Sequence, residues 1–312
     1  MFKRHGYSSL SSFRSRLWLR MKNMLKEVEK GVILINKPVG ITSFGVVARV
    51  RGKYFPGQKV GHTGTLDHMA SGLLILLVGE ATKGQGDFMK LPKEYEGEFA
   101  LGLESDTYSA DGRLRFYYLC HTSPPPANTN KDVACDLVSH VGRLTNVPDK
   151  SCLRQIRFGE LARYTSIKSE EIETVFKRFL GELEQAVPPF SAVQVKGERL
   201  HKLARKGRPL PELPRRRIYV ESLKLLDFKP FILVGASASG GHVPLPSPED
   251  FLKKIAPRVM FRTCVSSGTY IRSLVVDIGK ELGTGAILTQ LTRTRIGPYK
   301  LSDAIELPID IG

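Results

Sequence analysis

The chain has 312 residues, of which 41% are hydrophobic and 25% are charged, a composition that is ordinary for a soluble globular protein. Its 47 lysines and arginines outnumber its 31 acidic residues and give a formal net charge of +16. Such an excess is typical of proteins that approach a polyanion, so nucleic acid is the expected partner ahead of an acidic membrane surface. No run approaches the roughly 18 to 20 apolar residues of a membrane-spanning helix, so we do not expect a membrane protein.

The N-terminal segment, residues 1–30, is basic and rich in serine. Its first 25 residues, MFKRHGYSSLSSFRSRLWLRMKNML, contain six lysines or arginines, five serines and no acid. This composition is typical of a mitochondrial transit peptide. A basic arm fits equally, as does a start codon placed too far upstream, since Met21 and Met24 precede the first core-like segment. We treat residues 1–30 as an extension and expect a cytoplasmic protein, with a mitochondrial location as the alternative.

The structured part is predicted to begin at Gly31. GVILINKP reads as a short buried strand ended by proline and glycine, and SFGVVARVRGKYF reads as an amphipathic helix capped by Thr42 or Ser43. The stretch GHTGTLDHMASGLLILLVGEATK then supplies a turn, a loop and a buried strand. It holds a lone carboxylate, Asp67, just before the apolar run. Burying a charge without a partner costs several kcal/mol, so Asp67 is either a turn residue open to water or a group held by a partner.

The middle of the chain is predicted to contain a strand, a turn, a helix and two insertions. EYEGEFALG forms the strand and ESDTYSADG the acidic turn. A loop-rich insertion is expected at about residues 116–160 and a second at about 235–256. Between them Ser169 is expected to cap a helix with one buried face, formed by Ile172, Val175, Phe176, Phe179 and Leu180.

The C-terminal third is predicted to form a strand, a turn and a helix. Residues 259–265 alternate as a strand, and SSGT turns the chain. A helix closed by Gly283 follows, and its buried stripe consists of Ile271, Leu274, Val275, Ile278 and Leu282. Arg272 lies off that stripe and is expected to face the sheet edge or the solvent. Without a regular βαβ rhythm or a GxGxxG motif, the order of elements favours an α+β fold with a largely antiparallel sheet.

Metal and disulfide chemistry are not indicated. The four cysteines are scattered without a CxxC pair, and the histidines show neither HExxH nor another zinc-ligand spacing. We expect free thiols and no metal.

Five stretches, taken together and in order, closely resemble the TruB family of tRNA pseudouridine synthases. They are GVILINKPVGITS, GHTGTLDHMASGLL, KEYEGEFALG with ESDTYSADG, VPPFSAVQVKGERLHKLARKG and CVSSGTYIRSLVVDIGKELGTGA. The resemblance covers most of residues 31–305. It implies a pseudouridine synthase fold, with a central antiparallel sheet flanked by helices, over residues 31–312. It also implies isomerisation of the uridine in the T-arm loop of tRNA, conventionally position 55, a reaction that needs neither a redox cofactor nor a metal.

The resemblance assigns three catalytic residues. Asp67 of GTLD is the implied nucleophile, and an unperturbed aspartate, with a pKa of about 3.9, is ionised near neutral pH. Arg272 of TYIR is the implied partner of that carboxylate. Tyr95 of KEYEG is the implied tyrosine that stacks on the target base, although a core aromatic would fit the same strand position. Whether such an aspartate attacks the ribose or the base stays open.

The implied substrate-binding residues are more scattered. His62 corresponds to a histidine that stacks beside the flipped-out nucleotide, and Leu291 could line the pocket with Arg293. Lysines and arginines are candidate phosphate contacts, namely Lys37, Arg199, Lys202, Arg205, Lys206 and the RRR at 215–217. Asp106, Tyr108 and Asp111 are expected to shape the turn at the rim of the site.

Three positions depart from the family pattern. His68 stands where proline is usual, Gln194 where lysine is usual, and His201 where tyrosine is usual. The first departure frees the backbone of the catalytic loop, because proline fixes φ and histidine does not. We also expect no C-terminal PUA-type RNA-binding domain.

Three functions remain open. The first is a tRNA pseudouridine synthase that acts on the T arm as a monomer with unknown protein partners. The second is the same chemistry on messenger or ribosomal RNA, and the third is a non-catalytic RNA-binding protein of the same fold.

Overall fold

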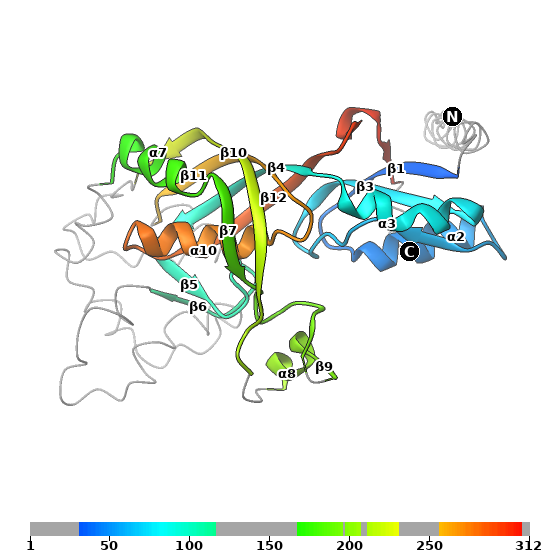
Figure 1. The fold of residues 1–312 in the computed structure, drawn as a ribbon, viewed down its shortest axis with the longest axis horizontal. Coiled ribbons are helices and arrows are strands. Elements are labelled where there is room, and N and C mark those ends of the chain that lie inside the picture. The colour runs from blue at the N-terminus through cyan, green and yellow to red at the C-terminus, as the bar shows by residue number, and fades with distance from the viewer. Residues whose placement is uncertain (1–30, 117–166, 196, 207–210, 231–255, 308–312) are drawn as a thin grey trace, which may run out of the picture. The chain divides into compact units, whose positions relative to one another are not determined.

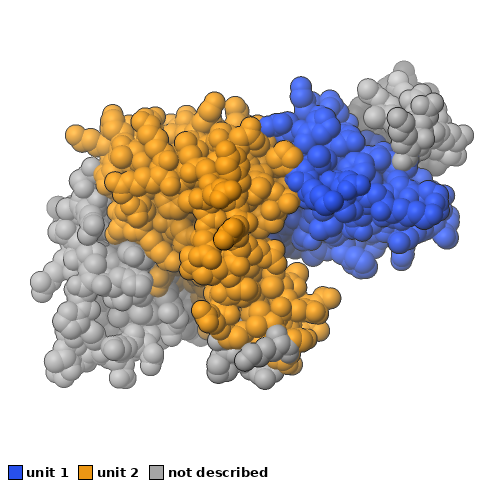
Figure 2. Space-filling model, in the orientation of Figure 1, with its two compact units in different colours: residues 1–91, 292–312 blue, residues 92–291 orange. Residues whose placement is uncertain are grey.

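The structure is a computed structural model that describes residues 31–116, 167–195, 197–206, 211–230 and 256–307 (Figure 1). The chain divides into two compact units (Figure 2). Unit 1 consists of residues 1–91 and 292–312, and unit 2 of residues 92–291. The basic extension at 1–30 lies outside the described residues, as do nearly all of the insertions expected at about 116–160 and 235–256.

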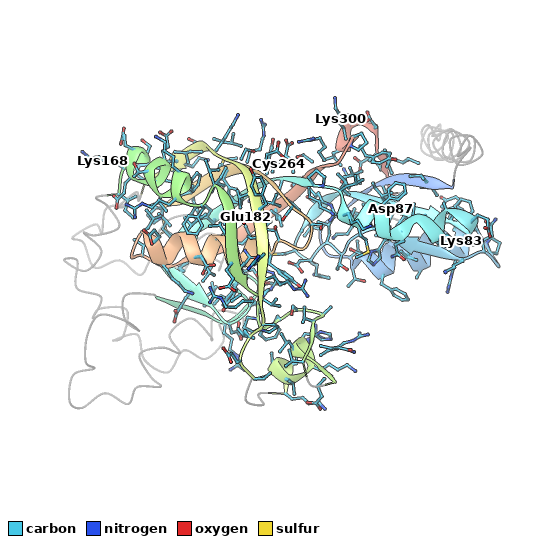
Figure 3. All side chains as sticks on the ribbon, viewed as in Figure 1. Lys83, Asp87, Lys168, Glu182, Cys264 and Lys300 are labelled. Atoms are coloured by element: carbon cyan, nitrogen blue, oxygen red, sulfur yellow. The ribbon has the colours of Figure 1, made fainter. Side chains whose placement is uncertain are left out.

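Unit 2 is built on an antiparallel sheet. Its long strands are β4 (Lys93–Leu101), β11 (Arg258–Val265), β10 (Arg215–Lys229) and β7 (Gly181–Ala186). Each is antiparallel to the next in that order. The two small hairpins are β5 (Leu103–Ser105) with β6 (Leu114–Phe116), and β8 (Gln194–Val195) with β9 (Glu198–Arg199). Cys264 of β11 (Figure 3) is buried, and its Sγ donates a hydrogen bond of 3.0 Å to Glu221 Oε2.

The described residues of unit 2 also form three helices, α7 (Ser169–Arg178), α8 (Leu200–Arg205) and α10 (Ile271–Glu281). The buried stripe predicted for α10 is confirmed, and Gly283 follows the helix with a φ of +67°. The cap predicted for α7 is wrong, because Lys168 occupies the N-cap position and Ser169 is the first helical residue. The α7 stripe is also shorter than predicted. Leu180 is 43% exposed because it comes after the end of the helix.

Unit 1 contains a small mixed sheet. Strand β3 (Ser71–Val78) pairs antiparallel with both β1 (Val32–Lys37) and β2 (Val60–His62). Strand β12 (Ala286–Ile296) belongs to unit 2 as far as Leu291, and its last part pairs parallel with β3. The shorter elements are η1 (Gly79–Gly84), α3 (Gln85–Lys90), β13 (Tyr299–Lys300), η4 (Leu301–Asp303) and β14 (Ile305–Glu306).

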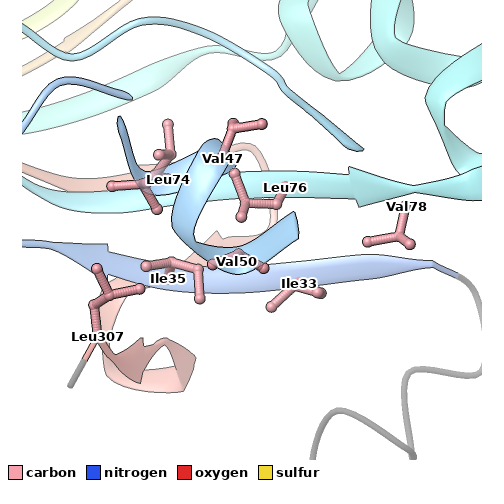
Figure 4. Close-up of a cluster of buried hydrophobic side chains, with 9 residues drawn as sticks. Ile33, Ile35, Val47, Val50, Leu74, Leu76, Val78 and Leu307 are labelled. Atoms are coloured by element: carbon pink, nitrogen blue, oxygen red, sulfur yellow. The ribbon is translucent and has the colours of Figure 1, made fainter. Parts of the chain in front are cut away.

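Helix α2 (Ser43–Tyr54) covers one face of the β1–β3 pair. Its valines at 46, 47 and 50 pack with alternating residues of both strands, including Ile33, Ile35, Leu74 and Leu76 (Figure 4). Burying such a side chain is worth about 1.5 to 3 kcal/mol relative to leaving it exposed. Thr42 caps the helix, since its Oγ1 accepts a hydrogen bond of 2.9 Å from Gly45 N. The predicted strand, helix and second strand are therefore confirmed, and Thr42 is the cap.

Both units combine helices with mostly antiparallel strands. Only the β1–β14 and β12–β3 pairs are parallel among the strand pairs described. The predicted α+β class with a largely antiparallel sheet is confirmed. Within the described residues, no helix is long and apolar enough to span a membrane.

Candidate active site

Asp67 lies in the loop that connects β2 to β3 in unit 1. Its side chain is partly exposed, and its carbonyl accepts a hydrogen bond of 3.1 Å from Ala70 N, which closes a turn just before β3. The apolar strand that follows is buried along nearly its whole length. The lone carboxylate of this stretch therefore sits in a turn anchored by a buried strand.

The start of α2 is tied to the Asp67 loop at two points. Ser43 Oγ accepts a hydrogen bond of 2.8 Å from Leu66 N and donates one of 3.2 Å to Leu66 O, and the serine is 1% exposed. Gly40 N donates a bond of 3.0 Å to the carbonyl of His68. These bonds hold the residues on both sides of Asp67. A proline at position 68 would present the same carbonyl, so the tie does not depend on the unusual histidine.

Arg293 on β12 donates hydrogen bonds to the backbone of the same loop and of the strand that follows it. It is 1% exposed, and its Nε donates a bond of 2.7 Å to Leu73 O while its Nη2 donates one of 3.1 Å to Gly64 O. This arginine reaches the loop because β12 runs directly beside the start of β3. At that contact Gly72 has a φ of +103°, and a Cβ there would lie 2.4 Å from Arg293 O. Arg293 was predicted to line the pocket, and the structure instead buries it against the loop backbone.

Replacing Arg293 with methionine is expected to lower the free energy of unfolding by about 3 kcal/mol, because the buried carbonyl of Leu73 and the part-buried carbonyl of Gly64 lose this donor. Urea denaturation of purified protein would measure the change. Lys300→Met is the control, since Lys300 is exposed in the same unit and its loss should cost less than about 0.5 kcal/mol. Equal stabilities of the two variants would contradict the assignment of Arg293 to the loop.

Lys37 at the end of β1 is completely buried, with 0% of its surface exposed. Its ammonium donates hydrogen bonds of 2.9 Å to Pro38 O and 2.8 Å to Ile41 O. A side chain in this position cannot contact a phosphate, so the phosphate role predicted for Lys37 is not supported. Burial lowers the pKa of Lys37 to about 8, although attraction to Asp67 acts in the opposite direction and Arg293 adds to the lowering.

The stability of the protein is expected to depend on pH through Lys37. Between about pH 8 and pH 10.5 the unfolded chain holds a proton on Lys37 that the folded chain has released. The free energy of unfolding should therefore rise with pH in this window, and a Lys37→Met variant should lack that contribution. Urea denaturation of both proteins at several pH values would show the wild type gaining stability relative to the variant. A difference that stays constant through the window would contradict this prediction.

His62 ends β2 and is partly buried. Its Nδ1 accepts a bond of 3.3 Å from Gly64 N, so the proton of the neutral ring is on Nε2, and its carbonyl accepts a bond of 2.7 Å from Gln85. Burial lowers the pKa of His62, and the charge of Arg293 adds to the effect. Near neutral pH the side chain is therefore an uncharged, oriented ring. Its predicted stacking on a nucleotide stays a prediction.

Arg272 lies in the first turn of α10 in unit 2 and is 6% exposed. Its Nη1 donates a bond of 2.8 Å to Thr107 O and its Nη2 one of 3.1 Å to Phe190 O. The sequence placed this side chain at the sheet edge or in solvent, and that prediction is wrong because loop residues from two distant segments cover it. Gln185 of β7 fixes the start of α10, bonding Tyr270 N at 2.8 Å and Tyr270 O at 3.0 Å.

The acidic turn at 104–112 supplies the Thr107 carbonyl, one of the two carbonyls that Arg272 binds. Tyr108 in this turn has a φ of +65°, and its carbonyl accepts a bond of 3.2 Å from Leu288 N. Burial raises the pKa of the Tyr108 hydroxyl, with Asp277 adding to the effect. Asp106 accepts a bond of 2.8 Å from Arg113 N, and Asp111 accepts a short one from Ser109 Oγ. These residues thus shape the turn.

The remaining predicted residues also belong to unit 2. Tyr95 on β4 is 8% exposed and stands opposite Thr263 of β11, and Leu291 on β12 is also buried. Arg205 and Lys206, at the end of α8, are exposed and accessible to a phosphate. Asp67, Lys37 and His62 are grouped in unit 1, so the pairing of Asp67 with Arg272 stays a prediction. Ser43 was missed as a site residue because it was weighed only as a helix cap.

Known families match most of the chain. Residues 52–153 and 155–242 match the N-terminal domain of the TruB family of pseudouridylate synthases. Residues 272–308 match the C-terminal domain of tRNA pseudouridylate synthase B. Asp67 and Tyr95 lie in the first matched region, and Arg272, Leu291 and Arg293 in the second.

Two similar proteins also indicate the TruB family. The tRNA pseudouridine synthase B of Fusobacterium nucleatum is 33% identical over 272 residues, which cover 87% of this chain and 69% of the relative. That of Aquifex aeolicus is 34% identical over 277 residues, which cover 89% and 72%. The chain also resembles a structure in a Cbf5-Nop10-Gar1 complex, with a TM-score of 0.51 and 24% identity over 91% of this chain. It spans 54% of that solved chain, which supports the fold alone. The chain belongs to the TruB family of pseudouridylate synthases.

Proposed function

We propose that this protein is a tRNA pseudouridine synthase that converts the T-arm loop uridine, conventionally position 55, to pseudouridine, with Asp67 as the nucleophile. One observation carries the proposal. Asp67 is a partly exposed carboxylate in a loop that is hydrogen-bonded to Ser43 of α2 on one side, to Gly40 before α2 on the other, and to Arg293. A nucleophile needs such a fixed position, because misplacement by about 1 Å can cost a hundredfold in rate.

The reaction breaks the bond between C1′ and N1 of the uridine and forms one between C1′ and C5. The displaced uracil turns within the site before it is rejoined, C5 loses its proton, and N1 gains one, so no electron is transferred overall. An aspartate can act near neutral pH without a separate base, since its unperturbed pKa is about 3.9. The target base must leave its stack to reach the carboxylate, which costs a few kcal/mol.

Arg272 and Tyr95 have proposed roles beside Asp67. Two of the five N–H groups of an arginine are used by the Thr107 and Phe190 carbonyls, and we propose that others donate to the Asp67 carboxylate. The planar guanidinium suits this role, because it can bind several oxygens in one plane. Tyr95 is proposed to stack on the flipped base and assist proton transfer.

Carbodiimide-based mapping of total RNA from cells with and without the gene tests the function. We expect the T-arm signal of tRNA to disappear when the gene is removed and to return with the wild-type gene. Loss of signals confined to messenger or ribosomal RNA would favour the same chemistry on another substrate. An unchanged map, with RNA binding retained in vitro, would favour the non-catalytic RNA-binding protein.

We also propose a cytoplasmic location for a monomeric enzyme, with mitochondria as the alternative compartment. The basic, serine-rich segment at 1–30 motivates the alternative. Fluorescent fusions with and without these residues would separate the two. A mitochondrial signal that depends on residues 1–30 would contradict the cytoplasmic proposal.

A further inference from the structure

The outer face of α2 is a basic surface next to the Asp67 loop. Arg49, Arg51 and Lys53 are exposed on this helix, and residues 31–66 contain no aspartate or glutamate at all. Among the residues that the structure describes, none of these three cations forms an ion pair with a carboxylate. Exposed helix surfaces usually mix both signs of charge, so this face is available to an anionic partner.

The segment at 39–44, which leads into α2, carries the two most exposed large apolar side chains of the described residues. Phe44 is 71% exposed and Val39 is 64% exposed. Each is next to a residue that ties α2 to the catalytic loop: Val39 precedes Gly40, and Phe44 follows Ser43. Both side chains therefore stand on the segment that is hydrogen-bonded to the neighbours of Asp67. An aromatic ring held in water beside a reactive loop is suited to stacking with an unpaired base.

The helix geometry places Arg51 on the same line as the ring and the other two cations farther around the exposed surface of α2. Phe44, Ala48 and Arg51 follow the spacing i, i+4 and i+7, so they lie on one line along the outer face. Arg49 and Lys53, five and nine residues after Phe44, lie about 140° and 180° around the helix axis from the ring, at the other edge of the exposed surface. The cations lie about 8 to 14 Å along the helix axis from Phe44, at 1.5 Å per residue. Only the small residues Ala48 and Gly52 lie between them, and a Cβ added at Gly52 would meet nothing within 4 Å.

We propose that this α2 outer face binds the stretch of substrate RNA that adjoins the target nucleotide, with Phe44 stacked on an unpaired base and the three cations on phosphates. The inference rests on the proposed function for the identity of the RNA. A single-stranded nucleic acid combines flat bases with a regular row of negative charges, and the proposed function makes that nucleic acid RNA. The ties at Gly40 and Ser43 couple this surface to the loop that carries the nucleophile.

Binding of a labelled T-arm stem–loop RNA to full-length protein tests the charges. The double variant Arg49→Ala/Arg51→Ala is expected to weaken binding at least about tenfold and to lower the slope of log Kd against log salt by about 1 to 1.5. The matched control is Lys83→Ala/Lys90→Ala, which removes the same charge from exposed lysines of unit 1 that pair with Glu80 and Asp87. Its affinity should stay within twofold of wild type. Equal losses in the two double variants would overturn the proposal, because net charge alone would then explain them.

Variants of Phe44 test the stacking. Phe44→Ala is expected to weaken binding about 5- to 100-fold, Phe44→Tyr to bind like wild type, and Phe44→Leu to lose most of the affinity because it keeps apolar area without a flat ring. The exposed position makes all three compatible with folding, which a thermal melt would verify. Wild-type affinity in Phe44→Ala would overturn the proposal. A Phe44 variant that loses self-association, measured by light scattering, but keeps its RNA affinity would also overturn the proposal, since the ring would then form a contact between copies.

Pseudouridine formation is scored separately on the same RNA. If the wild type modifies the RNA and the α2 variants bind and react as it does, the α2 inference fails while the proposed function stands. If the wild type does not modify the RNA but its binding depends on Phe44, Arg49 and Arg51, the proposed function fails while the α2 inference stands.

Discussion

Asparagine in place of Asp67 is expected to reduce pseudouridine formation in a T-arm transcript by at least about four orders of magnitude, the scale of losses seen when a covalent nucleophile is removed. The amide has nearly the shape of the carboxylate but is a poor nucleophile. The loop should stay intact, because its ties use the backbone of Leu66, His68 and Ala70. RNA affinity should therefore change by no more than a few-fold.

Carbodiimide-based mapping of the transcript measures the product, and a titration of labelled RNA measures the affinity. Asp87→Asn is the matched control, since it makes the same change at an exposed carboxylate of unit 1 outside the loop. The control should keep wild-type activity. Modification by the Asp67→Asn variant at a normal rate would show that the nucleophile has been misassigned.

Lysine in place of Arg272 is expected to lower turnover about 10²- to 10³-fold while weakening RNA binding only a few-fold. The guanidinium spans the carbonyls of Thr107 and Phe190, and a single ammonium cannot reproduce that fork together with the bond proposed to Asp67. Because Arg272 is 6% exposed, the lysine cannot recover its lost partners from water.

Steady-state kinetics on the same transcript, combined with binding titrations, would separate the two losses. The control is Arg262→Lys in the same unit, because Arg262 is about half exposed and pairs with Glu96 at 2.6 Å. A surface pair of this kind contributes about 1 kcal/mol at most, so the control should behave like wild type. Equal losses in turnover and binding for Arg272→Lys would count against a role beside the nucleophile.

Local patterns in the sequence predicted the elements around the site. The valines of α2 recur at helical spacing and are buried, and the apolar run after Asp67 is the buried strand β3. The stripe of α10 and the glycine that ends it were predicted in the same way. These predictions succeeded because one-sided burial imposes the period of the element on the apolar residues.

Two errors concern charged side chains that are covered by backbone outside their own helix or strand. Lys37 was expected on the surface as a phosphate contact, but the turn that follows β1 folds back over its ammonium. Arg272 was expected at the sheet edge or in solvent, but its two carbonyl partners lie 165 and 82 residues away. A periodic pattern shows which residues avoid water on one element. It does not show which loops will cover the remaining side chains.

The sequence by itself determined the α+β class, the strands and helices around Asp67, and, through its motifs, the TruB resemblance that the comparisons confirmed. Only the tertiary structure decided which charges are buried. Arg293 reaches the Asp67 loop from a strand 220 residues away and is 1% exposed, because parallel pairing of β12 with β3 brings its guanidinium to the Leu73 carbonyl. Burial of a charge is stable only where partners from the rest of the fold replace water, and those partners are fixed by topology rather than by neighbouring residues.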